Sequence, residues 1–96
     1  MEFLVTYDVA TDTAEGRRRL RKVAQICEGY GQRVQKSVFE CTLNPADMEK
    51  LKHRLVRTID LKEDSLRIYR LREPRQQFVE TIGVKPEFDL HEPLTV

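Results

Sequence analysis

The stretch QRVQKSVFECTL, residues 32–43, decides the fold of this chain. Strands usually have about 5–6 residues, so this segment is either one long bent strand or two short strands with a tight reversal near Lys36 and Ser37. Hydrophobic periodicity does not choose between the two. The segments on either side of it therefore have to define the topology.

The segment before it has the pattern of an amphipathic helix. Asp12, with Glu15 three residues later, has the spacing of a capping box, and Gly29 and Gly31 end the helix. Gly16 weakens the first turn by about 1 kcal/mol relative to alanine. The apolar stripe that would face the core consists of Leu20, Val23, Ala24 and Cys27.

The segment after it, NPADMEKLKHRLVRTI (44–59), predicts a second helix. Asn44 is a preferred N-cap residue, Pro45 is favoured at the first helical position, and Asp47 suits the positive end of the helix dipole. The apolar stripe of this helix consists of Met48, Leu51, Leu55 and Ile59.

Three other apolar segments predict strands: FLVTYDV (3–9), SLRIYRL (65–71) and FVETIG (78–83). If residues 32–43 form a hairpin, the order is β-α-β-β-α-β followed by an extra C-terminal strand. This is an α+β fold, the ferredoxin-like sandwich with two helices on one face of an antiparallel sheet. We assign residues 1–83 to this domain and residues 84–96 to a C-terminal arm.

Two helices would leave the other face of the sheet open. The first strand has apolar residues on both alternations, with Val5 and Tyr7 on one side and Leu4 on the other, so this face should also be covered. A second copy of the chain is the simplest cover, which predicts a homodimer with the sheets facing each other. The apolar residues of the arm, which we expect to pack on the partner protomer, are Phe88, Leu90, Leu94 and Val96.

The composition is that of a small globular domain. The 96 residues allow one core, and 34% charged with 40% hydrophobic residues excludes a disordered chain. There is no apolar run near the roughly 18 residues of a membrane span and no signal peptide, so we expect a cytoplasmic location. Cys27 and Cys41 lack a metal-binding spacing, and we expect both to be reduced core thiols.

The net charge is only +1, but the charges are unevenly distributed. A first basic group, in which Glu28 is the one acid, consists of Arg17, Arg18, Arg19, Arg21, Lys22, Arg33 and Lys36. A second consists of Arg67, Arg70, Arg72 and Arg75. Such a polarised surface attracts polyanions, although a solvated helix face is the alternative interpretation. Because no amide pair or aromatic ladder is placed to read bases, we expect contacts to nucleic-acid phosphates.

Motifs for several other chemistries do not occur in the sequence. It has no glycine-rich phosphate loop, no HExxH motif and no Cys/His cluster for zinc. We interpret His53 and His91 as surface residues, and Ser37 has no neighbouring histidine to activate it. The sequence therefore argues against a nucleotide-binding loop, a zinc centre and a nucleophilic triad.

The sequence resembles the CRISPR-associated family usually called Cas-two (Cas2). The resemblance rests on VTYDV (5–9), RLRKVAQICEGYGQRVQKSVFECTL (19–43) and SLRIYRL (65–71), and it extends from Phe3 to about Ile82. It implies a ferredoxin-like homodimer, a hairpin within residues 32–43, and a role in CRISPR spacer acquisition beside the integrase subunit, Cas-one (Cas1). It also implies a magnesium-dependent endonuclease acting on RNA or duplex DNA.

Asp8 is the candidate metal ligand. Strand alternation places it with Leu4 and Thr6, opposite the face of Tyr7, so two copies could approach across a two-fold axis. Mg²⁺ commonly binds one or two carboxylates together with waters and a substrate phosphate, and a shared ion would relieve the repulsion between two carboxylates. The alternative is a strand-end aspartate that accepts hydrogen bonds from nearby backbone amides.

These considerations predict a Mg²⁺-dependent phosphodiesterase with a catalytic site of Asp8, Tyr7 and Phe39. Tyr7 and Phe39 would shape the site, while Arg19 and Arg33 would hold phosphates. No second acid or base stands beside Asp8 in the sequence, so a non-catalytic scaffold that clamps duplex DNA for the integrase is the alternative. A ribonuclease toxin of the virulence-associated D type is a third interpretation, which would need no integrase partner.

Overall fold

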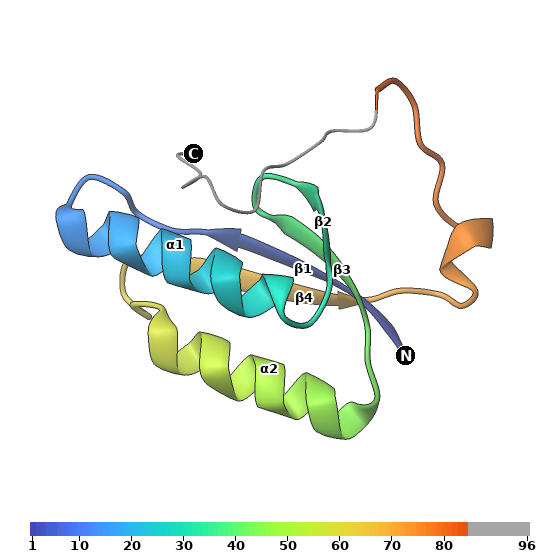
Figure 1. The fold of residues 1–96 in the computed structure, drawn as a ribbon, viewed down its shortest axis with the longest axis horizontal. Helices are drawn as coiled ribbons and strands as arrows, with labels where there is room; N and C mark the ends of the chain where they lie inside the picture. The colour runs from blue at the N-terminus through green and yellow to red at the C-terminus, as the bar shows by residue number, and fades with distance from the viewer. Residues whose placement is uncertain (85–96) are drawn as a thin grey trace.

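A computed structural model of the chain describes residues 1–84. The elements are β1 (Glu2–Asp8), α1 (Ala14–Glu28), β2 (Gln32–Gln35), β3 (Val38–Thr42), α2 (Pro45–Thr58) and β4 (Ser65–Arg70). The strands form one antiparallel sheet in the order β2-β3-β1-β4, and both helices lie on the same side of it (Figure 1). The predicted α+β topology with a βαββαβ order is confirmed.

Residues 32–43 form a hairpin, with the reversal at residues 36–37. Arg33 of β2 lies opposite Phe39 of β3, and the register shifts between Arg33 and Gln35, which indicates a bulge. Directly opposed residues of an antiparallel pair lie on the same face of the sheet. The pairing therefore places Arg33 on the same side as Phe39, toward the helices.

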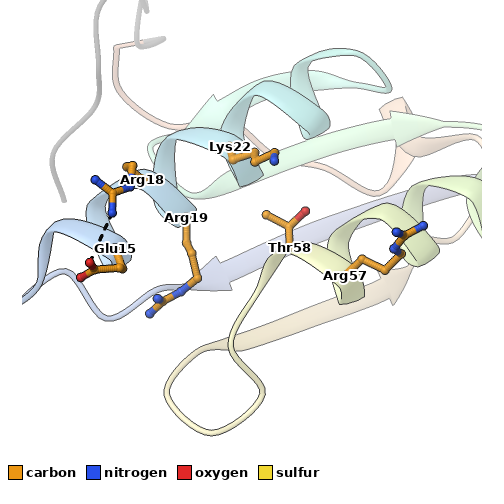
Figure 2. A pocket seen from close by; sticks show the side chains of 6 residues that line it. All are labelled: Glu15, Arg18, Arg19, Lys22, Arg57 and Thr58. Carbon is orange, nitrogen blue, oxygen red and sulfur yellow. Dashed lines mark hydrogen bonds and ion pairs between the residues drawn. The ribbon is translucent and has the colours of Figure 1, made fainter.

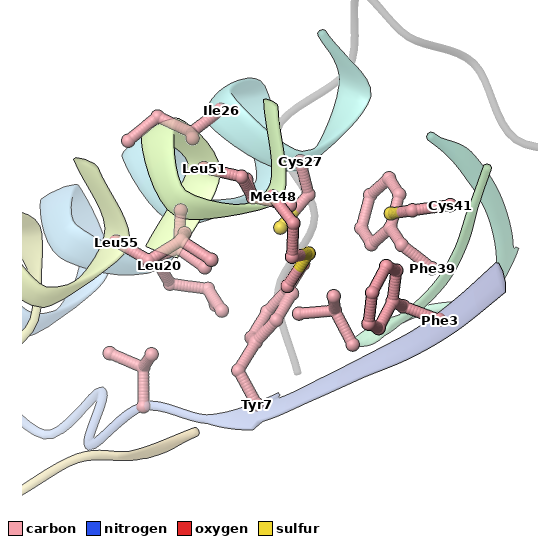
Figure 3. Close-up of a cluster of buried hydrophobic side chains, with 13 residues drawn as sticks. Phe3, Tyr7, Leu20, Ile26, Cys27, Phe39, Cys41, Met48, Leu51 and Leu55 are labelled. Carbon is pink, nitrogen blue, oxygen red and sulfur yellow. The ribbon is translucent and has the colours of Figure 1, made fainter. Parts of the chain in front are cut away.

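The core lies between the helices and one face of the sheet (Figure 3). In β1 the residues Phe3, Val5 and Tyr7 are buried and alternate with less buried ones. The helices contribute Leu20, Val23, Ile26, Cys27, Met48, Leu51 and Leu55 to the buried cluster. Neither of the two described helices is long and apolar enough to cross a membrane.

Both cysteines are buried in this core and are free, as expected. Burial is the main cause that raises the pKa of Cys27 to about 12 and that of Cys41 to about 11. Both thiols are therefore protonated at neutral pH and are poor nucleophiles.

The helix caps agree with the prediction for α2 and differ for α1. Asn44 caps α2 through its side chain, as predicted. In α1 the N-cap is Thr13, whose hydroxyl accepts a hydrogen bond from the Gly16 amide at 3.0 Å, so the prediction of Asp12 is wrong by one residue. A Cβ atom added at Gly16 would lie 1.9 Å from the Ala10 carbonyl oxygen. Glycine here permits the close approach of α1 to the loop that follows β1.

The predicted strand at residues 78–83 is not formed. After β4 the chain makes a short 3₁₀ turn, η1 (Arg75–Gln77), and residues 78–84 that follow are exposed and have no regular structure. The chain leaves the sheet at this turn (Figure 1), so these residues have no neighbouring strand with which to exchange backbone hydrogen bonds. The apolar residues of the predicted arm lie outside the described residues.

The face of the sheet turned away from the helices is called the open face below. Arg75 lies against it: its Nη1 is 3.4 Å from Glu2 Oε2 in β1, and its Nε is 3.6 Å from Glu40 Oε1 in β3. The other open-face residues of β1, β3 and β4 are Leu4, Thr6, Asp8, Val38, Thr42, Ser65, Arg67 and Tyr69. This face is therefore mixed, with few large apolar side chains.

Candidate functional site

Asp8 is the last residue of β1 and lies opposite Ser65, the first residue of β4. Its side chain is exposed on the open face. Within residues 1–84 its carboxylate makes no hydrogen bond and no ion pair. This argues against the alternative in which the Asp8 carboxylate accepts hydrogen bonds from backbone amides at the strand end. Both carboxylate oxygens are available to a ligand.

A hydroxyl and a guanidinium lie on the same face as Asp8. Ser65 is directly opposite, and Arg67 comes two residues later in β4, opposite Thr6. The Arg67 Nη1 donates a hydrogen bond to the Tyr69 hydroxyl at 3.1 Å, and this bond raises the pKa of Arg67. Arg67 carries its positive charge on the same face as the Asp8 carboxylate, an arrangement that suits a cation at Asp8 and a phosphate oxygen at Arg67.

Asp64, directly before β4, holds the loop that follows Asp8. Its buried carboxylate accepts hydrogen bonds from the Ala10 amide at 3.0 Å, the Asp60 amide at 2.8 Å and the Arg19 Nε at 2.8 Å. Burial by itself raises the pKa of Asp64, but these hydrogen bonds outweigh it, so the pKa lies below its ordinary value of 3.8. Asp64 therefore fixes the end of β1 against α1 and the start of β4.

The structure places Tyr7 and Phe39, the residues predicted to shape the site, on the side of the sheet opposite Asp8. Adjacent strand residues point to opposite faces, and both rings are buried, with their centroids 6.2 Å apart. Arg33 joins them, with its guanidinium 5.0 Å from the Phe39 ring centroid and its Nη1 3.6 Å from Glu28 Oε1. These residues form a buried cluster that faces the helices.

The predicted phosphate-binding residues fall into two groups. Those that are exposed are Arg17, Arg18, Arg21, Lys22 and Lys36. Arg33 is only 9% exposed. Arg19 is held between α1 and the loop before β4, with ion pairs to Asp64 at 2.8 Å and to Glu63 at 3.4 Å. Of the predicted residues, those that a polyanion can reach therefore lie on the exposed side of α1 and at the hairpin turn.

The donor set around Asp8 suits a weakly held Mg²⁺ ion. Among residues 1–84 there is no group of three or more His, Cys, Asp or Glu side chains that could hold a metal. Mg²⁺ keeps several of its waters and often uses only one or two carboxylates with a substrate phosphate, which an exposed and unpartnered Asp8 allows. A structural zinc site needs four protein ligands and does not fit here.

Two residues of this site, Ser65 and Arg67, were not predicted from the sequence as site residues. The sequence feature that could have identified them is the alternation in SLRIYR, which puts Ser65 and Arg67 on one side of β4. That signal becomes useful only with the register between β1 and β4, because the pairing of Asp8 with Ser65 brings them to the carboxylate.

Comparisons with known proteins agree with one another. The family model "CRISPR associated protein Cas2" matches residues 1–79. The "CRISPR-associated endoribonuclease Cas2 1" of Moorella thermoacetica is 57% identical over 96 residues, 100% of either chain. The "CRISPR-associated endonuclease Cas2" of Halalkalibacterium halodurans is 52% identical over 94 residues, 98% of either chain. The crystal structure of Streptococcus pyogenes Cas2 at pH 6.5 has a TM-score of 0.79 and 57% identity, covering 86% of this chain and 100% of that chain.

Proposed function

Because the chain belongs to the CRISPR-associated Cas2 family, we propose that it is a cytoplasmic, Mg²⁺-dependent endonuclease that acts in spacer acquisition beside the integrase subunit Cas1. Relatives at 57% and 52% identity are named endoribonuclease and endonuclease, which supports a phosphodiesterase activity. The observation that carries the proposal is the exposed carboxylate of Asp8, which has no protein partner within residues 1–84. Its substrate is RNA or duplex DNA.

The open face supplies the groups that such a reaction needs. Asp8 would hold the ion through its carboxylate, and bound Mg²⁺ would polarise the phosphodiester and lower the pKa of a water. Arg67 donates to a non-bridging phosphate oxygen and neutralises part of its charge. Ser65 can hydrogen-bond a water or a phosphate oxygen beside the carboxylate. Asp64 keeps the end of β1 in place through the Ala10 amide.

The active form in this proposal is a homodimer in which the open faces meet. Leu4, Val38 and Tyr69 give this face an apolar part that a second copy would bury, and Tyr69 is 44% exposed in the single chain. The two Asp8 side chains would then approach across a two-fold axis. A shared ion would offset the repulsion between the two carboxylates.

Asp8→Asn tests the proposal, because it keeps the shape of the side chain and removes its charge. The matched control is Asp12→Asn, which removes the same charge from an exposed residue in the loop before α1. Both variants are assayed with labelled single-stranded RNA and duplex DNA over a Mg²⁺ titration, with chelator as blank. Because the bound ion supplies several kcal/mol of transition-state stabilisation, we expect Asp8→Asn to lose at least about 100-fold in kcat and Asp12→Asn to cleave like the wild type. Cleavage by Asp8→Asn at the wild-type rate would show that Asp8 is not catalytic.

A non-catalytic scaffold is the second candidate function. It is favoured because, among the described residues, Asp8 belongs to no group of three or more His, Cys, Asp or Glu side chains. In this case the protein would clamp duplex DNA for Cas1, and the wild type and Asp8→Asn would support spacer integration equally well. Purified wild type that binds duplex DNA and cleaves neither substrate would also favour the scaffold.

A further inference from the structure

The two helices enclose a cleft with a volume of about 390 Å³ between the first half of α1 and the C-terminal end of α2 (Figure 2). Its lining residues are Glu15, Arg18, Arg19, Lys22, Arg57 and Thr58. Because the helices cover the side of the sheet opposite the open face, the cleft is separated from Asp8 by the sheet. We propose that this cleft binds the phosphodiester backbone of a nucleic acid and that Lys22 and Arg57 are the main residues that contact its phosphates. This inference rests on the proposed function in taking a nucleic acid as the partner.

Lys22 and Arg57 carry charges that no acid balances. Both are exposed, and neither makes an ion pair within residues 1–84. Lys52, elsewhere on α2, does have an acidic partner, with its Nζ 3.1 Å from Glu49 Oε1. The C-terminal end of α2 favours a cation such as Arg57 by about 0.3–1 kcal/mol, but this does not account for Lys22 on the other helix. The two unbalanced cations on facing walls are the arrangement that an anion would stabilise.

The other charged residues of the cleft have defined roles. Arg19 is already neutralised by the buried Asp64, with which it forms a hydrogen bond of 2.8 Å, so it shapes the wall and contributes little charge. Arg18 pairs with Glu15 at 3.3 Å, and both side chains are well exposed. An exposed pair of this kind is worth little, so Arg18 can exchange its carboxylate for a phosphate.

The distribution of cations fits a chain of phosphates better than a single small anion. Arg18 and Lys22 are four residues apart on α1, which is about 6 Å along the helix axis. Arg17 and Arg21 are exposed on the same helix but do not line the cleft. A phosphodiester backbone seated in the cleft would continue past these residues, whereas one free phosphate would contact the cleft alone.

The test compares Lys22→Gln/Arg57→Gln with Lys50→Gln/Lys52→Gln. The control removes the same charge from exposed lysines of α2 that do not line the cleft. Circular dichroism melting first verifies that both variants keep the fold. Fluorescence anisotropy then measures binding of a labelled duplex DNA and of a labelled single-stranded RNA at several salt concentrations, and unlabelled inorganic phosphate serves as competitor.

We expect the cleft variant to bind about ten-fold more weakly than the control at low salt, from the loss of two ion pairs. The slope of log K against log salt should flatten by about 1.8 per bound chain for duplex DNA, or by about 1.4 for a single strand. The larger effect identifies which of the two nucleic acids occupies the cleft. In the cleavage assay the cleft variant should raise KM and leave kcat unchanged, the opposite of Asp8→Asn.

Three results would overturn the proposal. Affinity and salt slope equal to those of the control would remove the cleft as a binding site and leave the proposal for Asp8 intact. Loss of phosphate binding in the cleft variant, measured directly by isothermal titration calorimetry, without any loss of affinity for either nucleic acid would assign the cleft to a free anion. Wild type that binds neither nucleic acid at low salt would overturn this inference together with the proposed function.

Discussion

Replacing Asp64 with asparagine tests how the end of β1 is held. Oδ1 of Asp64 accepts from the Ala10 amide, and Oδ2 accepts from the Asp60 amide and the Arg19 Nε. Asparagine has one acceptor oxygen, so in either orientation its NH₂ group faces N–H donors that lose their partner. A hydrogen bond to a charged group is worth about 1.5–3 kcal/mol. We therefore expect the free energy of unfolding to fall by about 3 kcal/mol, which lowers Tm by about 12–24 °C in a domain of this size.

The stability that Asp64 contributes should decrease at acid pH. The pKa of Asp64 is lower in the folded protein than its ordinary value, so its contribution to stability is complete above the pKa of the unfolded chain, about 3.9. The contribution is lost as the pH falls through the folded pKa. The difference in stability between the wild type and Asp64→Asn should thus be constant near neutral pH and should shrink below about pH 4.

Urea unfolding followed by far-UV circular dichroism, at one fixed protein concentration, measures both quantities. The control is Glu63→Gln, because Glu63 is 55% exposed and meets Arg19 only at 3.4 Å. We expect the control to cost less than about 1 kcal/mol. A loss for Asp64→Asn no larger than that of the control, or a difference that does not change with pH, would refute the role given to Asp64.

Two other predictions concern Gly16 and the C-terminal residues. Gly16→Ala should destabilise the fold by about 1–3 kcal/mol, because its Cβ would lie 1.9 Å from the Ala10 carbonyl oxygen; a gain in Tm, as expected from helix propensity alone, would contradict this contact. Truncation after Gly83 should leave the domain folded and weaken the proposed dimer, measured by light scattering over a dilution series. A truncated dimer of unchanged stability would count against packing of the arm on the partner.

Elements defined by local pattern could be predicted from the sequence. The cap at Asn44 and the apolar stripe of α2 follow from residues near each other in the chain, and α2 is found where expected. The strand predicted at residues 78–83 has a suitable apolar content, but a strand also needs a neighbour. The turn η1 directs residues 78–83 away from the other strands, and the periodicity of the sequence does not predict this turn.

In the candidate site, too, features that follow from local pattern could be predicted, and features that depend on contacts between distant segments could not. Strand alternation correctly put Asp8 on the face opposite Tyr7. The prediction that Arg33 is a surface cation did not foresee its pairing with Phe39, which turns it toward the core. The hydrogen bonds of Asp64 join segments distant in the chain. Periodicity has no information on such contacts, since it describes one segment at a time.

The ion pairs of Arg75 with Glu2 and Glu40 affect how another molecule can cover the open face. These carboxylates have side chains that are 13% and 19% exposed, and the arginine of the same chain already occupies the position between them. A molecule that lies over β1 and β3 either packs on this guanidinium or displaces it and supplies a replacement cation. In the second case, covering the open face is an exchange of ion pairs and not a simple addition. Added salt weakens the internal pairs, so it should speed this exchange while it slows the capture of polyanions at the basic cleft.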